Sequence, residues 1–134
     1  MKVLLLTSWL EAFYPDLRER YPDVDFKEVY EAKDVVGEVA DAEVVFGYLD
    51  ADQFEAAKNL KWIQTLDAGV EALLGKAPAV IDSDVIVTNA RGAGAPQIGE
   101  HAVALVLMFA RGLNRFWRLQ QDHKWDQDYG LSIV

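Results

Sequence analysis

Residues 60 to 76, "LKWIQTLDAGVEALLGK", contain the clearest chemical signal in this sequence. An apolar run typical of a buried strand stops at Asp67, and a helical pattern starts at Val70. The N–H groups of Ala68, Gly69 and Val70 would then lie at the start of a helix, where unpaired donors and the helix dipole attract a carboxylate or a phosphate. A structural interpretation is also open, in which Gly69 permits a tight turn and Asp67 caps the helix.

A second stretch, residues 88 to 96, reads "TNARGAGAP" and resembles a cofactor loop only in part. Its G-x-G lacks the third glycine of the dinucleotide fingerprint, because Gln97 stands at that position. Pro96 is better explained as the first residue of a helix. The small residues still allow close approach of a ligand, and Asn89 and Arg91 would direct polar groups into the same cleft.

The two histidines invite catalytic roles that their surroundings do not support. Neither His101 nor His123 belongs to a spaced set of metal ligands, and Glu100 is adjacent to His101 on a helix, where consecutive residues do not face each other. We therefore predict that both are structural or face solvent, and we predict no metal site.

Five short apolar runs recur at intervals of roughly twenty residues, each followed by a helical pattern. This alternation predicts an α/β fold with a parallel sheet covered by helices on both faces. In such sheets ligands bind beyond the carboxyl ends of the strands, so the turn after Leu66 is one of the candidates. The predicted strands are Val3 to Thr7, Val24 to Val29, Glu43 to Tyr48, Lys61 to Leu66 and Val85 to Thr88.

From Pro96 to about Gln121 the pattern stays helical, which predicts one long helix of roughly 37 Å. It is longer than a small five-stranded sheet needs for cover, and it is apolar on two sides. Because the second side has no obvious partner in a chain of this size, we expect another surface to cover it. The first side comprises Ile98, Ala102, Leu105, Phe109, Leu113 and Phe116, and the second Val103, Leu107, Ala110 and Trp117.

Length and composition exclude several classes of protein. At 134 residues we expect one domain that folds alone, and the absence of cysteine favours a reducing cytoplasm. A formal net charge of -9 opposes nucleic-acid binding, although it leaves open a halophilic or an acidic mesophilic source. The apolar stretch at residues 102 to 110 is too short for a membrane span, so we predict a soluble protein.

Two other five-stranded classes fail on their key residues. A phospho-acceptor receiver domain needs an acidic pair where this chain has Ser8 and Trp9, and a lysine where it has Asn89. A flavodoxin needs a phosphate loop rich in Thr, Ser and Gly after the first strand, and "TSWLEAFYP" does not supply one.

Three stretches, "NLKWIQTLDAGVEALL", "VIVTNARGAGAPQIGEHAVALVLMFARGL" and "QQDHKWDQ", together resemble the amino-terminal part of the NAD(P)-dependent D-2-hydroxyacid dehydrogenases. That family includes glyoxylate/hydroxypyruvate reductases and formate dehydrogenase. The resemblance covers nearly the whole chain and implies a flavodoxin-like, five-stranded parallel sheet with a long C-terminal helix. It implies that residues 1–95 form a substrate-binding domain and 96–125 a helix that leads to an NAD-binding domain, with 126–134 as a tail.

The resemblance also implies a site. The turn of Ala68, Gly69 and Val70 matches the loop that donates backbone N–H groups to the substrate carboxylate, and Asn89 matches a position at the substrate site. Tyr48 and Leu49 match a loop that lines the pocket. Asp67 departs from the family, which commonly has a small neutral residue there, so its charge weakens anion binding unless the side chain turns away to cap the helix.

The family's glycine-rich loop and its catalytic arginine, glutamate and histidine follow this segment, so we expect no catalytic residue and no cofactor site here. The parent reaction implied is NAD(P)H-dependent reduction of a 2-oxo acid to a D-2-hydroxy acid. The chain alone is expected to be inactive, to bind small 2-oxo or 2-hydroxy acids weakly, and to form a homodimer through the long helix. The alternative is a non-catalytic flavodoxin-like module, natural or engineered.

Overall fold

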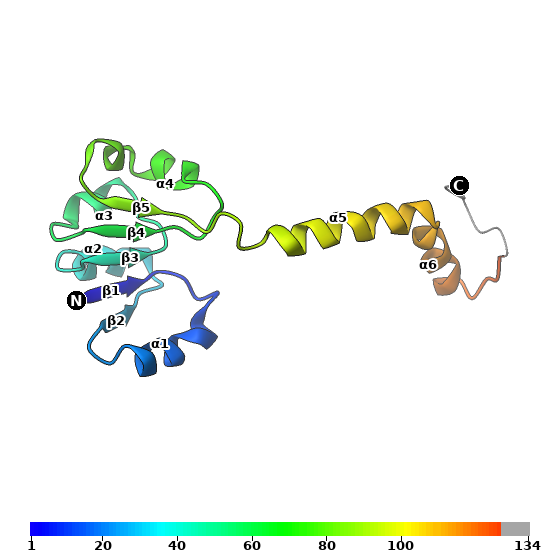
Figure 1. The fold of residues 1–134 in the computed structure, drawn as a ribbon, viewed down its shortest axis with the longest axis horizontal. Helices are drawn as coiled ribbons and strands as arrows, with labels where there is room; N and C mark the ends of the chain where they lie inside the picture. Colours follow the sequence, from blue (N-terminus) through cyan, green and yellow to red (C-terminus); the bar gives the residue numbers. More distant parts are fainter. Residues whose placement is uncertain (127–134) are drawn as a thin grey trace. The chain divides into compact units, whose positions relative to one another are not determined.

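The structure, a computed structural model, describes residues 1–126 and divides into two compact units, Met1–Arg91 and Gly92–Val134. Beyond Asp126, the predicted tail lies outside the described residues. Unit 1 contains the sheet and unit 2 contains two helices (Figure 1).

Unit 1 is built on a five-stranded, all-parallel sheet with the order β2-β1-β3-β4-β5. This order confirms the predicted flavodoxin-like α/β fold. The strands are β1 (Lys2–Leu5), β2 (Asp25–Glu28), β3 (Val44–Phe46), β4 (Trp62–Gln64) and β5 (Ile86–Thr88). The connections contain α1 (Tyr14–Arg20), α2 (Ala32–Val39), α3 (Ala51–Ala56) and α4 (Glu71–Lys76), with short 3-10 turns η1 (Glu11–Phe13) and η2 (Pro78–Asp82).

One face of the sheet is closed by α2, α3, α4 and η2. Leu4, Val45 and Ile63 stand in register on β1, β3 and β4 and are fully buried on this face. They join Val35 of α2 and Leu73 of α4 in one core cluster. Because successive residues of a strand point to opposite faces, the apolar runs of the sequence supply both faces at once.

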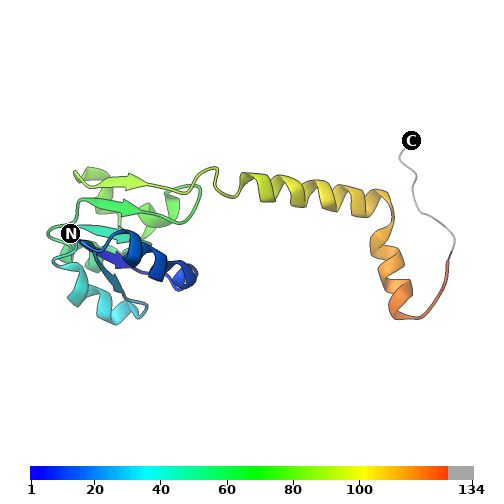
Figure 2. The ribbon, with the colours of Figure 1, turned by 60° about the horizontal axis from the view of Figure 1, so that its bottom comes forward.

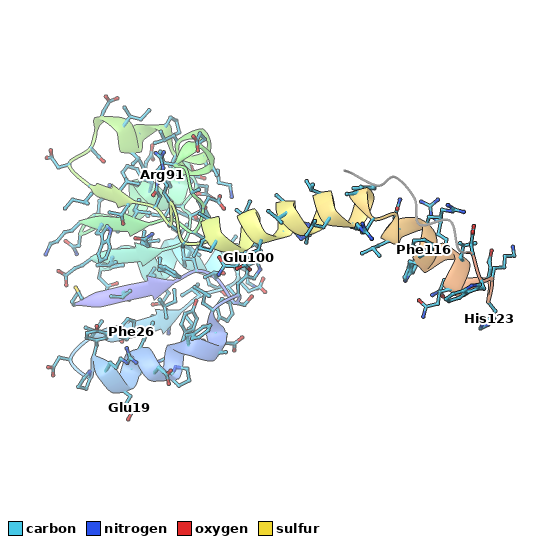
Figure 3. All side chains as sticks on the ribbon, turned by 45° about the vertical axis from the view of Figure 1, so that its right-hand side comes forward. Glu19, Phe26, Arg91, Glu100, Phe116 and His123 are labelled. Carbon is cyan, nitrogen blue, oxygen red and sulfur yellow. The ribbon has the colours of Figure 1, made fainter. Side chains whose placement is uncertain are left out.

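The opposite face is covered by α1, which lies in front of the sheet in Figure 2. Tyr14 of α1 is buried there, and Phe26 of β2 packs against the same cluster (Figure 3). Farther along this face, Trp62 and Ile86 remain exposed. An apolar cavity of about 700 Å³ lies between α1 and the sheet. This face of unit 1 is therefore only partly closed.

The turn after β3 depends on a glycine. Gly47 has a φ of 133°, and a Cβ at this position would lie 2.9 Å from the Cβ of Leu6, directly after β1. A larger residue would meet both backbone strain and a steric clash. Immediately afterwards α3 starts with a capping box, in which Asp50 and Gln53 each accept a hydrogen bond from the other's backbone N–H. These two features position Tyr48 between them.

Unit 2 corrects the prediction of one continuous helix. It contains α5 (Ala95–Ala110) and α6 (Leu113–Gln121), separated at Gly112, which adopts a left-handed conformation with φ 63°. The N–H of Gly112 donates to the carbonyl of Phe109, which satisfies the end of α5. The apolar periodicity runs through the break, because a single glycine hardly disturbs a pattern of period 3.6.

Both helices of unit 2 lack a buried residue. Apolar residues on two sides of α5, among them Ile98 and Leu107, are exposed. The sequence predicted that Trp117 continues the second apolar side of α5. The break at Gly112 ends that continuation, so this prediction is wrong. Within residues 1–126, no helix combines the length and the hydropathy needed to cross a bilayer.

Candidate functional site

The carboxyl edge of the sheet brings together the turns after β3, β4 and β5. The N–H of Ala90, in the loop after β5, donates to the carbonyl of Asp67 in the turn after β4 at 2.9 Å. At the strand ends, the N–H of Thr65 donates to the carbonyl of Thr88 at 2.8 Å. The two loops that the sequence selected, around Gly69 and Asn89, are thus joined by backbone hydrogen bonds.

The turn after β4 presents three unpaired donors. Among the residues that the structure describes, the N–H groups of Ala68, Gly69 and Val70 donate to no protein acceptor. The carbonyl of Val70 already accepts from Leu74, so α4 begins directly after the turn. Since α4 has only six residues, its dipole is small, and the donors themselves are the chemically useful feature.

Asp67 does not cap α4, which excludes the capping interpretation that the sequence left open. The N-cap position of α4 is Val70, and no side chain accepts a hydrogen bond there. The Asp67 carboxylate instead accepts a hydrogen bond from the Tyr48 hydroxyl, with 2.6 Å between Oδ2 and Oη. The backbone N–H of Asp67 also donates to that hydroxyl at 3.2 Å. Asp67 is therefore attached to the loop after β3.

Tyr48 connects the loop after β3 to the turn after β4 and to the end of α4. Burial and the hydrogen bond to Asp67 raise the pKa of the Tyr48 hydroxyl, so it stays a proton donor at neutral pH. The ammonium group of Lys76, at the end of α4, lies 5.6 Å from the centroid of the Tyr48 ring, within the range of a cation–π contact. A tyrosine between a carboxylate and an ammonium is a polar group with a defined orientation.

A second carboxylate lies against the turn. A Cβ built on Gly69 would come within 1.9 Å of Oε2 of Glu71, so the Glu71 side chain folds back over Gly69. Gly69 does not have a positive φ, so its backbone conformation would tolerate a larger residue. The nearest atoms to a Cβ at this position all belong to the side chain of Glu71. Because this is the end of a flexible, exposed side chain, it can move away from the turn.

The loop after β5 presents Asn89 at the surface. Its side-chain oxygen accepts a hydrogen bond from the N–H of Arg91 at 3.1 Å, which closes a local turn. Within the described residues the side-chain NH2 of Asn89 has no acceptor, so it can donate to a ligand. The exposed Arg91 adds a cation two residues farther on.

The loop after β3 contributes its two predicted residues differently. Tyr48 is partly exposed, whereas Leu49 is fully buried in the core cluster. Both border a pocket of about 360 Å³, whose wall also includes Lys76. Leu49 therefore acts mainly in packing, and Tyr48 carries the polar function of this loop.

Thr65 and Lys76 belong to the site but were not selected from the sequence. Thr65 is fully buried, and its hydroxyl lies 3.3 Å from the carbonyl of Thr88 and 3.5 Å from that of Gly69. A threonine inside an apolar strand is a detectable signal, because a buried hydroxyl needs a partner. Nothing in the local sequence indicates that Lys76 reaches Tyr48.

The two histidines and the largest apolar cavity offer no competing polar site in the part of the chain that the structure describes. His101 on α5 and His123 after α6 are both exposed. In residues 1–126, no three His, Asp or Glu side chains form a cluster that could hold a metal ion. The larger cavity under α1 has a mainly apolar wall, which includes Phe46 and Gln64 at the ends of β3 and β4. The carboxyl edge is therefore the candidate site.

Comparison with known proteins places the fold in a class. No family model matches the chain. D-lactate dehydrogenase from Aquifex aeolicus, solved with NAD and lactic acid, is similar over 96% of this chain, with a TM-score of 0.77 and 20% identity. A D-isomer specific 2-hydroxyacid dehydrogenase family protein from Aeromonas salmonicida is similar over 93%, with a TM-score of 0.76 and 21% identity. These structures establish the shared fold.

A curated relative agrees at the level of sequence. D-3-phosphoglycerate dehydrogenase from Archaeoglobus fulgidus is 29% identical over 137 aligned positions, which cover 99% of this chain. The resemblance to D-2-hydroxyacid dehydrogenases is therefore confirmed. The chain spans 26% of the length of that relative and 39% and 40% of the two solved chains, so the similarity covers only a part of each of these enzymes.

Proposed function

We propose that this chain is the substrate-binding part of an NAD(P)-dependent D-2-hydroxyacid dehydrogenase. The observation that supports this most directly is the turn of Ala68, Gly69 and Val70, whose three donors lie unpaired at the carboxyl end of β4. Carboxylates bind well to such groups, because charge-assisted hydrogen bonds to unpaired N–H groups replace hydration. Asn89, on the adjoining loop, adds a donor for a second oxygen of a 2-oxo acid.

The bound nicotinamide would supply the hydride that converts the C2 carbonyl to an alcohol. The residues present do not form a dinucleotide loop, since the G-x-G after β5 is followed by Gln97 where a third glycine is needed. This chain therefore binds and orients the acid, and its own groups do not carry out the chemical step. The proton donor and the cofactor site belong to other parts of the proposed enzyme.

Substrate binding is tested by titrating the isotopically labelled chain with pyruvate and oxalate, while its amide resonances are followed by NMR. Binding is expected to be weak, because the turn is open to water and association costs several kcal/mol. The amides of Ala68, Gly69 and Val70 should shift first, and sodium sulfate at equal ionic strength serves as the control. Shifts confined to other loops would contradict the site.

The same preparation is assayed for NADH- and NADPH-dependent reduction of glyoxylate, pyruvate and hydroxypyruvate. No turnover above buffer is expected, and turnover that survives repurification would contradict the division of roles. Absence of both turnover and ligand shifts would favour a non-enzymatic module.

We also propose that two copies of the chain associate through α5. Support comes from the exposed apolar residues on α5, including Val103 and Leu107, which no part of unit 2 buries. Association of two such stripes would remove a few hundred Å² of apolar surface from water, at about 25 cal/mol per Å². A mass near 30 kDa by light scattering, twice the 15.0 kDa of one chain, is the expected result.

A further inference from the structure

We propose that Asp67 makes this site selective for 2-oxo acids whose only negative charge is the C1 carboxylate. The inference rests on the proposed function, because it concerns the side chain next to the turn that would bind that carboxylate. The proposed substrates are acids in which the groups attached beyond C1 are neutral or cationic. Phosphorylated and dicarboxylic acids are disfavoured.

The position of the Asp67 carboxylate is fixed by Tyr48. One hydroxyl lies 2.6 Å from Oδ2 of Asp67 and 3.2 Å from its backbone nitrogen. The carboxylate is thereby held close to its own backbone, immediately before the first donor of the turn. A fixed negative charge at this place acts on every anion that approaches Ala68 to Val70.

Glu71 adds a second negative charge on the other side of the turn. Its carboxylate lies against Gly69, as the 1.9 Å separation from a Cβ at that position indicates. Glu71 is free to rotate away when a ligand carboxylate binds, whereas Asp67 is tied to Tyr48. Asp67 is therefore the group that persists beside a bound substrate.

The nearby cations are less able to compensate. Lys76 lies over the Tyr48 ring, and Arg91 follows Asn89 on the next loop. Both have long, exposed side chains, which lose rotamer freedom when they are held at one ligand. Two mobile cations offset the charge of one substrate carboxylate. A phosphate group adds about two further negative charges, which Asp67, Glu71 and the net charge of -9 on the chain would repel.

The test compares pyruvate with 3-phosphoglycerate in NMR titrations of the whole chain and of Asp67→Asn. Asparagine can still accept the hydrogen bond from Tyr48 while it removes the charge. One charge at about 6 Å in a solvent-exposed site changes affinity about fivefold. Pyruvate is therefore expected to bind the variant about fivefold more tightly, and 3-phosphoglycerate, which carries more charge, about twentyfold more tightly.

Two variants serve as controls. Asp84→Asn makes the same change of net charge at the amino edge of the sheet, before β5, and should leave the ratio of the two affinities unchanged. Tyr48→Phe keeps the charge of Asp67 but removes the hydrogen bond that holds its carboxylate. The ratio of the two affinities should therefore lie between those of the unmodified chain and of Asp67→Asn. Amide spectra and unfolding midpoints establish that each variant folds.

A second measurement needs no variant. In the unmodified chain the preference for pyruvate should shrink as the ionic strength rises from about 20 mM to about 500 mM, because salt screens exposed charges. A preference that does not change with salt would contradict the inference even if Asp67→Asn does not fold.

The outcomes separate this inference from the proposed function. If Asp67→Asn raises the affinity for both acids equally, or for neither, Asp67 does not make the site selective. Shifts of the amides of Ala68 to Val70 with pyruvate would still support the proposed function. If neither acid shifts the resonances of these amides in any variant, both proposals are wrong.

Discussion

The two units of this chain differ in where their apolar side chains lie. In residues 1–91 they fill clusters on both faces of a parallel sheet, and Leu4, Val45 and Ile63 are completely buried. In α5 and α6 no side chain is buried, although α5 contains long apolar stretches. Unit 1 therefore has a core of its own, whereas unit 2 has an apolar surface suited to a partner.

The strongest test of this difference is Ile63→Ala. Ile63 is fully buried between Val45 and Val87 on the closed face of the sheet. Removing its side chain leaves a cavity, so the free energy of unfolding should fall by about 2 to 5 kcal/mol. Urea unfolding followed by circular dichroism measures this, and a loss below about 1 kcal/mol would mean that the core of unit 1 is looser than described.

Leu107→Glu should have an effect of intermediate size. This effect should be on the association of two chains and not on their folding. A carboxylate in the apolar stripe of α5 would raise the dimer dissociation constant at least tenfold, which corresponds to about 1.4 kcal/mol. Glu100, one heptad earlier on the same helix, shows that the stripe ends in a charge (Figure 3). Light scattering over a concentration series is the measurement, and Gln97→Glu, elsewhere on α5, is the charge-matched control.

Persistent dimers in Leu107→Glu would mean that the copies associate through another surface. A monomeric unmodified chain would mean that α5 does not form the interface at all. In either case the unfolding of unit 1 should remain as it is in the unmodified chain, since its core contains no residue of α5.

The smallest effect is expected for Ile86→Thr. Ile86 is 63% exposed on β5, on the partly closed face of the sheet. Threonine keeps the β-branched shape that suits a strand, so the free energy of unfolding should change by less than about 0.5 kcal/mol. A loss comparable to that of Ile63→Ala would show that something covers this face in solution, which would weaken the contrast between the two units.

Local patterns in the sequence were enough to predict the sheet, and they marked the turn after Leu66 as one of several candidate sites. The alternation of apolar runs and helical patterns predicts parallel strands, and parallel strands direct ligands to their carboxyl ends. The strand, turn and helix around Gly69 lie within about fifteen consecutive residues, so their order is encoded locally. The capping box of α3 is local in the same sense, since Asp50 and Gln53 are three residues apart.

The break of unit 2 at Gly112 shows a limit of periodicity. A glycine within a helical pattern is compatible both with a continuous helix and with a left-handed end, because the apolar spacing is the same on both sides. The backbone conformation of one residue decided between them, and it redirected Trp117 away from the stripe of Leu107.

Residues close together in the chain specify the parallel sheet, the turn of Ala68 to Val70 and the apolar character of the last helices. The contact of Asp67 with Tyr48, nineteen residues away, in place of a cap at the start of α4, depends on the folded chain. So do the burial of Leu49 and the approach of Lys76 to Tyr48. These partners meet only because separate loops converge at one edge of the sheet, and no local pattern specifies which side chains meet there.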